Sequence, residues 1–186
     1  TLHPKIHAGI LYKRNNKSHI KQLKLNDFQN IDLVIVDFYP FEKVLKKTKN
    51  YNKILENIDI GGPSLVRSAA KNHKDVTVVT SIDQYQELIN EIKINNGATS
   101  LKFRQKMSRL AFNETAYYDS VISNYFNQLT KTYFPKKKII HTNLIEKLRY
   151  GENPHQEGAI YSSKNYLELE KIHGKQLSYN LSLIHI

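Results

Sequence analysis

Two adjacent glycines, Gly61 and Gly62, lie at the most informative point of the sequence. They follow Ile58-Asp59-Ile60 and precede Pro63. Glycines let the backbone approach a ligand closely, and Pro63 has the backbone angle of a first helical turn. Unpaired N–H groups of that helix then point at whatever lies above Gly62. Taken alone, the pattern is typical of an ordinary helix start with a tight turn, and an anion site is the functional alternative. The spacing differs from the Gly-x4-Gly-Lys-Ser/Thr phosphate loop, so it does not indicate a nucleoside triphosphate.

Asp37 and Tyr39 form a second candidate group, because they directly follow the apolar run 31–36. In open α/β sheets, ligands bind outside the carboxyl ends of the strands. A tyrosine hydroxyl can donate a hydrogen bond to an oxyanion, and an aspartate can accept a proton or hold a hydroxyl. The alternative is a turn built from Asp37 and Pro40.

A cationic string, Lys71-Asn72-His73, ends the segment that the glycines open. It could present an ammonium and an amide at the rim of a site, and the alternative is a helix end whose cations complement the dipole. His3 and His7 have the spacing of a helical metal pair. Pro4 disfavours helical backbone at His3, however, and no acidic residue stands close, so we expect no metal site.

The hydrophobic pattern predicts the strands and helices that must position these residues. β-branched runs at 31–36 and 75–80 predict buried strands. Helices are expected at 41–48, at 51–58, from 61 to about 73, from a Ser81 cap to about 95, and from Thr99 to about 126. Strands that alternate with helices indicate an α/β fold with a parallel sheet.

The composition excludes several classes of protein. The 186 residues include no cysteine, so disulfide scaffolds, iron–sulfur clusters and thiol nucleophiles are excluded. No apolar run approaches the ~20 residues that span a bilayer, and no secretory leader opens the chain, so we expect no membrane association and a cytoplasmic protein. The net charge of +11 could indicate nucleic acid, but only five of the 28 basic residues are Arg, and we expect no nucleic-acid partner. Because the chain begins at Thr1 without Met, we expect a further segment upstream.

Several strings together resemble the cyclohydrolase domain of the bifunctional purine biosynthesis family, which joins IMP cyclohydrolase to AICAR transformylase. They are residues 1–9, 39–41, 58–62, Arg67 with 69–73, and 118–119 with 124–126. Residues 148–155, Leu-Arg-Tyr-Gly-Glu-Asn-Pro-His, resemble the opening of the transformylase domain. The likeness covers about residues 1–180, in the family's order and spacing.

The resemblance implies a fold and two reactions. The fold is a methylglyoxal-synthase-like parallel sheet with flanking helices, lacking its N-terminal part, followed by the beginning of a cytidine-deaminase-like domain. The cyclohydrolase closes formyl-AICAR to IMP with loss of water and needs no cofactor. The transformylase moves a formyl group from its co-substrate 10-formyltetrahydrofolate to AICAR. The family is an obligate cytoplasmic homodimer.

The resemblance also implies site residues. The catalytic ones are Asp59, which assists proton removal, and Lys71 with Tyr39, which stabilise the developing oxyanion. Substrate-binding positions are Thr1, Asp37, Gly61, Gly62, Arg149 and Tyr150. Asp37 departs from the family, where Asn is expected, and its charge would repel a phosphate or compete for Lys71. The family's catalytic Lys before Thr1 and its transformylase Lys-His pair are absent, so we expect this chain alone to be inactive.

The same resemblance divides the chain into an N-terminally truncated cyclohydrolase domain (1–127), a linker (128–138), the start of the transformylase domain (139–180) and a non-native tail (181–186). The polar, basic and proline-containing composition of 128–138 is itself typical of a linker. Two other classes of function stay open. A regulatory module would bind a phosphorylated metabolite without turnover, and a nucleic-acid-binding protein would show steeply salt-dependent affinity for any duplex.

Overall fold

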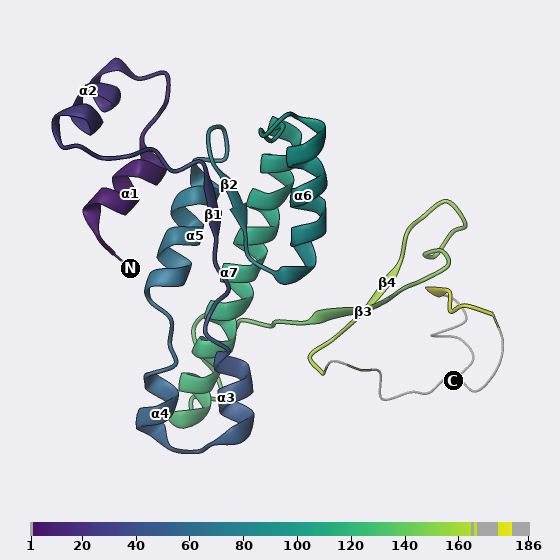
Figure 1. The fold of residues 1–186 in the computed structure, drawn as a ribbon. Coiled ribbons are helices and arrows are strands. Elements are labelled where there is room, and N and C mark those ends of the chain that lie inside the picture. Colours follow the sequence, from purple (N-terminus) through teal and green to yellow (C-terminus); the bar gives the residue numbers. More distant parts are fainter. Residues whose placement is uncertain (1, 165, 167–174, 180–186) are drawn as a thin grey trace. The chain divides into compact units, whose positions relative to one another are not determined.

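Two short parallel strands form the centre of the first part of the chain. Strand β1 (Leu33–Ile35) pairs with β2 (Thr77–Val79), and Val34 lies opposite Val78. The computed structural model describes residues 2–164, 166 and 175–179. The chain divides into two compact units, residues 1–133 and 134–186 (Figure 1). The mixed α/β architecture and the parallel pairing predicted from the sequence are confirmed.

The two strands differ in burial, which corrects one expectation. All of β2 is buried, as predicted. In β1 only Val34 is buried, whereas Leu33 and Ile35 are 37% and 45% exposed. The apolar run does not distinguish these cases, because among the described residues β1 pairs on one side only, with β2.

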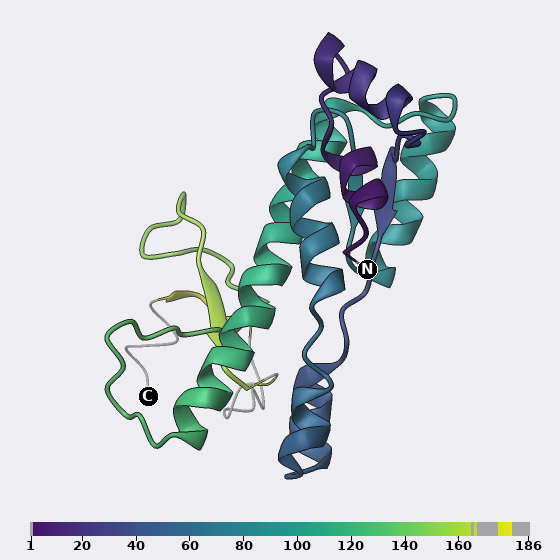
Figure 2. The same cartoon turned by 90° about the vertical axis from the view of Figure 1, so that its left-hand side faces the viewer.

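The first unit also contains helices. They are α1 (Pro4–Leu11), α2 (Lys17–Leu25), α3 (Phe41–Lys47), α4 (Tyr51–Leu55), α5 (Gly61–Lys71), α6 (Tyr85–Ile94) and α7 (Leu101–Leu129). Helix α5 contacts both strands, α7 and α1, and α7 also contacts β2 (Figures 1 and 2). No helix in the described part of the chain combines the length and apolarity needed to cross a bilayer.

Most predicted helix limits agree with the structure to within a few residues. Ser81 does cap a helix, but its hydroxyl accepts from Asp83 N in a 3-10 turn, Ile82–Gln84, which leads into α6. Ser100 rather than Thr99 caps α7, and the helix runs to Leu129, into the first two positions of the expected linker. Helix α4 stops at Leu55 instead of 58.

Helix α1 was not predicted. His3 has extended backbone, as the proline after it requires, and its ring accepts from Lys5 N. Pro4 then occupies the first turn of the helix, where a missing N–H costs nothing. Asn72 ties the end of α1 to the end of α5 by donating to Ile10 O (2.8 Å) and Tyr12 O (3.1 Å).

Two hydrophobic clusters lie along α7. The first half of the helix packs Phe103, Met107 and Ala111 against the strands and α5. The second half packs Tyr118 and Val121 against Phe41 of α3 and Ile54 of α4. One long helix therefore takes part in both cores of the first unit.

The second unit contains an antiparallel pair, β3 (Asn143–Lys147) with β4 (Ala159–Ser162). The connection between them is closed by Leu148 N donating to Gly158 O (2.9 Å) and Gly151 N donating to Gln156 O (2.7 Å). Residues 175–179 lie alongside, because Arg149 N donates to Leu177 O (2.8 Å).

Candidate functional site

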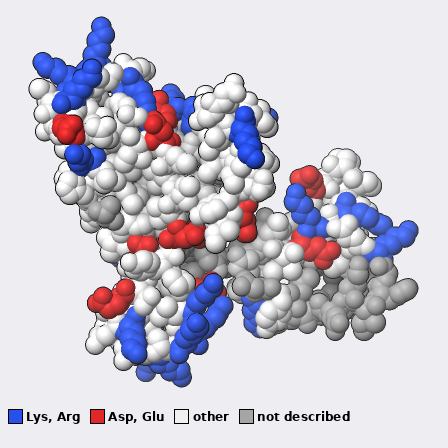
Figure 3. Space-filling view, in the orientation of Figure 1, with Lys and Arg blue, Asp and Glu red and all other residues white. Residues whose placement is uncertain are grey.

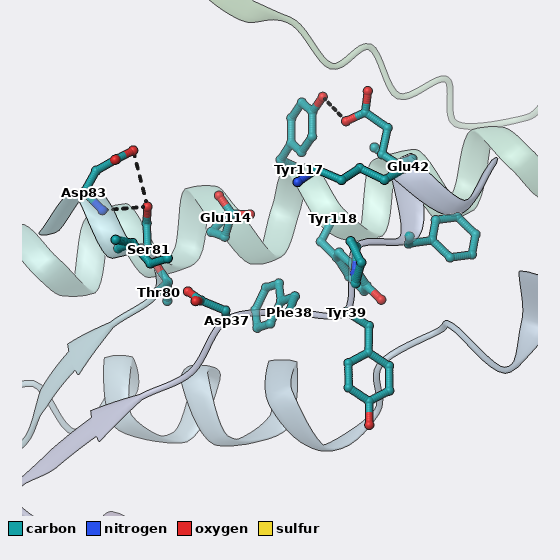
Figure 4. Close-up of a pocket in the computed structure, with 15 residues that line it drawn as sticks. Asp37, Phe38, Tyr39, Glu42, Thr80, Ser81, Asp83, Glu114, Tyr117 and Tyr118 are labelled. Atoms are coloured by element: carbon teal, nitrogen blue, oxygen red, sulfur yellow. Dashed lines mark hydrogen bonds between the residues drawn. The ribbon is translucent and has the colours of Figure 1, made fainter. Parts of the chain in front are cut away.

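A pocket of about 530 Å³ opens where the two parallel strands end (Figure 4). Residues 37–43, which follow β1, and 80–83, which follow β2, line it together with four residues of α7: Glu114, Tyr117, Tyr118 and Val121. This is the edge at which the sequence predicted ligand-binding side chains, and Asp37 and Tyr39 both line the pocket.

The charges of this pocket are mostly negative. Its carboxylates are Asp37, Glu42, Asp83 and Glu114, against the single cation Lys43 among the lining residues. Asp and Glu side chains gather across the middle of the first unit in Figure 3, with Lys and Arg above and below. Burial, and secondarily the Asp37 carboxylate, raise the pKa of Glu114. The pocket therefore favours a neutral or cationic part of a ligand over a phosphate.

The Asp59 carboxylate joins the loop before α5 to the loop after β1. Its Oδ1 accepts from Gly62 N at 2.8 Å, and its Oδ2 accepts from Tyr39 N at 3.3 Å. A side chain of the protein itself thus places a negative charge at the start of α5, where it accepts a hydrogen bond from an N–H of the first helical turn. Two backbone N–H groups, those of Gly62 and Tyr39, therefore fix the position of the Asp59 carboxylate.

Gly62 is required by this arrangement. A Cβ atom built on Gly62 would lie 2.5 Å from Asp59 Oδ2 and 2.9 Å from its Cγ. Gly62 is buried and Gly61 is partly buried, and both lie in the first turn of α5. The group that approaches Gly62 closely is the Asp59 side chain, and the approach of a ligand to the two glycines stays a prediction.

The Tyr39 side chain is exposed, and Lys71 lies far along α5 from Asp59. The Tyr39 side chain is 55% exposed, and Figure 4 shows its ring directed away from Asp37 and Glu114. Lys71 is exposed at the opposite end of α5, about 15 Å from Gly61 along the helix axis at 1.5 Å per residue. The structure thus brings Asp59, Gly62 and the Tyr39 backbone together and does not bring Lys71 to them.

Arg149 and Tyr150 form a stacked pair in the second unit. The Arg149 guanidinium lies 4.8 Å from the centre of the Tyr150 ring, and its Nη2 donates to the Tyr150 hydroxyl at 3.2 Å. Hydrogen bonds from Ser178 first, and from Arg149 second, lower the pKa of Tyr150. Arg149 also lines a pocket of about 420 Å³ with His155. Such a pair offers a charged fork and a phenol to a polar ligand.

The remaining residues singled out from the sequence lie outside the described residues or make contacts away from the pocket. Thr1 and the tail 181–186 lie outside the described residues. The His7 ring is within 3.2 Å of the Ser68 hydroxyl, and Asn72 is used between α1 and α5. Within the described part of the chain, no three side chains of His, Cys, Asp or Glu could hold a metal ion together.

The sequence reasoning missed the roles of Glu114 and Tyr118 in the pocket. Tyr118 enters the sequence analysis only within the string 118–119 that carries the resemblance, and the sequence pattern does not single out Glu114. Their spacing of four residues places both on one face of α7. That spacing is the signal that could have found Glu114 once the helix was predicted.

Comparison with known proteins shows the family to which the chain is similar. The family model described as "AICARFT/IMPCHase bienzyme" matches residues 69–183. Proteins named "Bifunctional purine biosynthesis protein PurH" are similar: that of Prochlorococcus marinus (strain MIT 9515) is 48% identical over 182 residues, and that of Persephonella marina (strain DSM 14350 / EX-H1) is 45% identical over 188. Each match covers 97% of this chain but 35% and 36% of the relative, so the chain spans about a third of their length.

One solved structure, described as "Crystal structure of ForH", is also similar. It superimposes with a TM-score of 0.58 and 26% sequence identity, over 68% of this chain and 66% of that one.

Proposed function

The chain belongs to the AICARFT/IMPCHase bienzyme family, and from this premise we propose that its first unit is the cyclohydrolase that closes formyl-AICAR to IMP. The Asp59 carboxylate carries the proposal, because it lies at the carboxyl edge of a parallel sheet and two backbone N–H groups fix it. Ring closure requires the carboxamide nitrogen to lose a proton while the formyl oxygen gains one. A fixed carboxylate is suited to the first of these tasks.

The individual roles follow from where each residue lies. Asp59 assists removal of the carboxamide proton, and the backbone of Gly61 and Gly62 helps to seat the ligand. Tyr39 donates from its hydroxyl after its exposed side chain turns toward the substrate. The assignment of Lys71 to the developing oxyanion rests on the resemblance alone, because Lys71 lies at the opposite end of α5 and shares no described contact with Asp59.

Asp37 binds the uncharged part of the ligand in this proposal. It lines an acidic pocket with Glu114 and Asp83, where a phosphate is disfavoured. The phosphate of the substrate therefore lies away from this pocket, and Thr1 joins the substrate-binding set from the start of the chain.

We also propose that the second unit begins the AICAR transformylase, with Arg149 and Tyr150 holding AICAR and 10-formyltetrahydrofolate as the co-substrate of the complete domain. The finer folds are a methylglyoxal-synthase-like sheet in 1–127 and the start of a cytidine-deaminase-like domain in 139–180, joined by the linker 128–138. The assembly is a cytoplasmic homodimer.

The test uses the native protein that contains this sequence. Formation of IMP from formyl-AICAR is followed with wild type and Asp59→Asn, which retains a hydrogen-bond-accepting oxygen but cannot accept the proton. We expect Asp59→Asn to lower the cyclisation rate by about a hundredfold or more, the scale of losing one positioned proton acceptor. Binding of formyl-AICAR without turnover by wild type would favour the regulatory module instead.

A further inference from the structure

The Tyr118 hydroxyl connects helix α7 to the loop that presents Asp59. It accepts a hydrogen bond from Asp59 N at 2.8 Å and donates one to Asn57 O at 3.3 Å. Asn57 and Asp59 lie in the loop between α4 and α5, outside any helix or strand. One side chain therefore satisfies a donor and an acceptor of this irregular segment.

The ring that carries this hydroxyl is firmly held. Tyr118 is 7% exposed, and its ring centre lies 5.1 Å from that of Phe38 and 6.3 Å from that of Phe41. Phe38 belongs to the loop after β1, and Phe41 begins α3. Burial raises the pKa of Tyr118, so the hydroxyl keeps the proton that it donates to Asn57 O.

The hydrogen bonds continue from this hydroxyl to the proposed catalytic groups. Tyr118 holds Asp59 N, and the Asp59 carboxylate in turn holds Gly62 N and Tyr39 N. A shift of the 57–59 loop would therefore move the carboxylate, the start of α5 and the Tyr39 backbone together. The bonds at Asp59 N and Gly62 N are 2.8 Å long, the bond from Tyr39 N is longer at 3.3 Å, and Tyr118 supplies the connection to α7.

We propose that Tyr118 is a positioning residue for the cyclisation, because its hydroxyl fixes the loop that aims the Asp59 carboxylate at the substrate. This inference rests on the function proposed above. Tyr118 acts through Asp59, so its effect must disappear when Asp59 no longer accepts the proton.

Tyr118→Phe in the native protein removes the hydroxyl and leaves the ring. We expect kcat for cyclisation to fall about tenfold, the scale of one lost hydrogen bond of about 1.4 kcal/mol, with KM within about twofold of wild type. Added to Asp59→Asn, the change should have no further effect, whereas independent sites add. An unchanged kcat in Tyr118→Phe, or additive losses in the double variant, would overturn the proposal.

Tyr125→Phe is the matched control. Tyr125 lies on the same helix and packs edge-on against Phe41 at 5.9 Å, so the change also removes one hydroxyl from this aromatic cluster. We expect wild-type kinetics from Tyr125→Phe. An equal loss of kcat in both variants would show a general effect of the cluster and contradict the positioning role.

Amide hydrogen exchange separates this inference from the proposed function. In Tyr118→Phe the amides of Asp59 and Gly62 should exchange at least about fivefold faster than in wild type, and in Tyr125→Phe they should not. If wild type shows no cyclisation, the proposed function fails while this exchange result still establishes that the hydroxyl fixes the loop. Unchanged exchange in Tyr118→Phe refutes the inference whatever the activity.

Discussion

Replacing Gly62 by alanine should destabilise the protein when Asp59 is present and stabilise it when position 59 is alanine. In an ordinary helix, Gly→Ala stabilises by about 0.5–1 kcal/mol, because alanine loses less backbone entropy on folding. Here the new Cβ would lie 2.5 Å from Asp59 Oδ2. Because the backbone of α5 is fixed within the helix, the Asp59 carboxylate must rotate away from the new Cβ atom.

The magnitude follows from the bonds that the Asp59 carboxylate then loses. Its bond from Gly62 N resembles that of a helix cap, for which about 1 kcal/mol is typical, and the bond from Tyr39 N contributes about 0.5–1.5 kcal/mol. After the gain from alanine is subtracted, Gly62→Ala should destabilise the native protein by about 1 kcal/mol. In an Asp59→Ala background the obstacle is gone, and the same change should stabilise by about 0.5–1 kcal/mol.

Urea unfolding of the four proteins of this cycle measures both numbers, provided that the slopes of the free energy against urea agree. The expected coupling between positions 59 and 62 is about 1.5–2 kcal/mol. A stabilising Gly62→Ala in the presence of Asp59, or the same effect in both backgrounds, would refute the account of Gly62 given above.

Three further predictions concern charge, catalysis and packing. Because burial and Asp37 raise the pKa of Glu114, its contribution to stability is complete below the ordinary glutamate pKa of about 4.3 and is lost as the pH rises through the folded value. Glu114→Gln should therefore raise the melting temperature at pH 7 and leave it unchanged at pH 4. Lys71→Ala should lower the cyclisation rate about a hundredfold with the melting temperature almost unchanged; wild-type turnover with a lowered melting temperature would show a structural role. Ser108→Ala, which removes a buried hydrogen bond to Ala70 O at 2.8 Å, should cost about 1 kcal/mol in urea unfolding, and a neutral result would contradict that bond's contribution.

The sequence predicted the parallel pair and five of the helices because those signals are local. Runs of β-branched residues, the Ser81 cap and the three- and four-residue spacing in α7 each act within a few residues. Asn96 and Gly97 both have positive φ and end α6, as their types suggest. Helix α1 was not predicted, because Pro4 was used only to exclude helical backbone at His3, although proline also favours the first turn of a helix that begins with it.

The site was less predictable, because its contacts join segments far apart in the chain. Asp59 and Tyr118 are 59 residues apart, and the bond between them depends on how α7 packs. The structure places the Asp59 carboxylate at the start of α5, and a pattern of residue types does not tell a bound anion from such a nearby side chain. Lys71 and Asp59 lie at opposite ends of α5, so the structure shows no contact between the two residues that the resemblance implied to be catalytic.

The long helix α7 makes the first unit behave as one cooperative system. Phe103, Met107 and Ala111 belong to one core, and Tyr118 and Val121 belong to the other. The pocket and the 57–59 loop lie against the second half of α7, which contains the smaller core. Fluctuations of the smaller core therefore set how often the region around Asp59 opens, and the larger core determines when the whole unit unfolds.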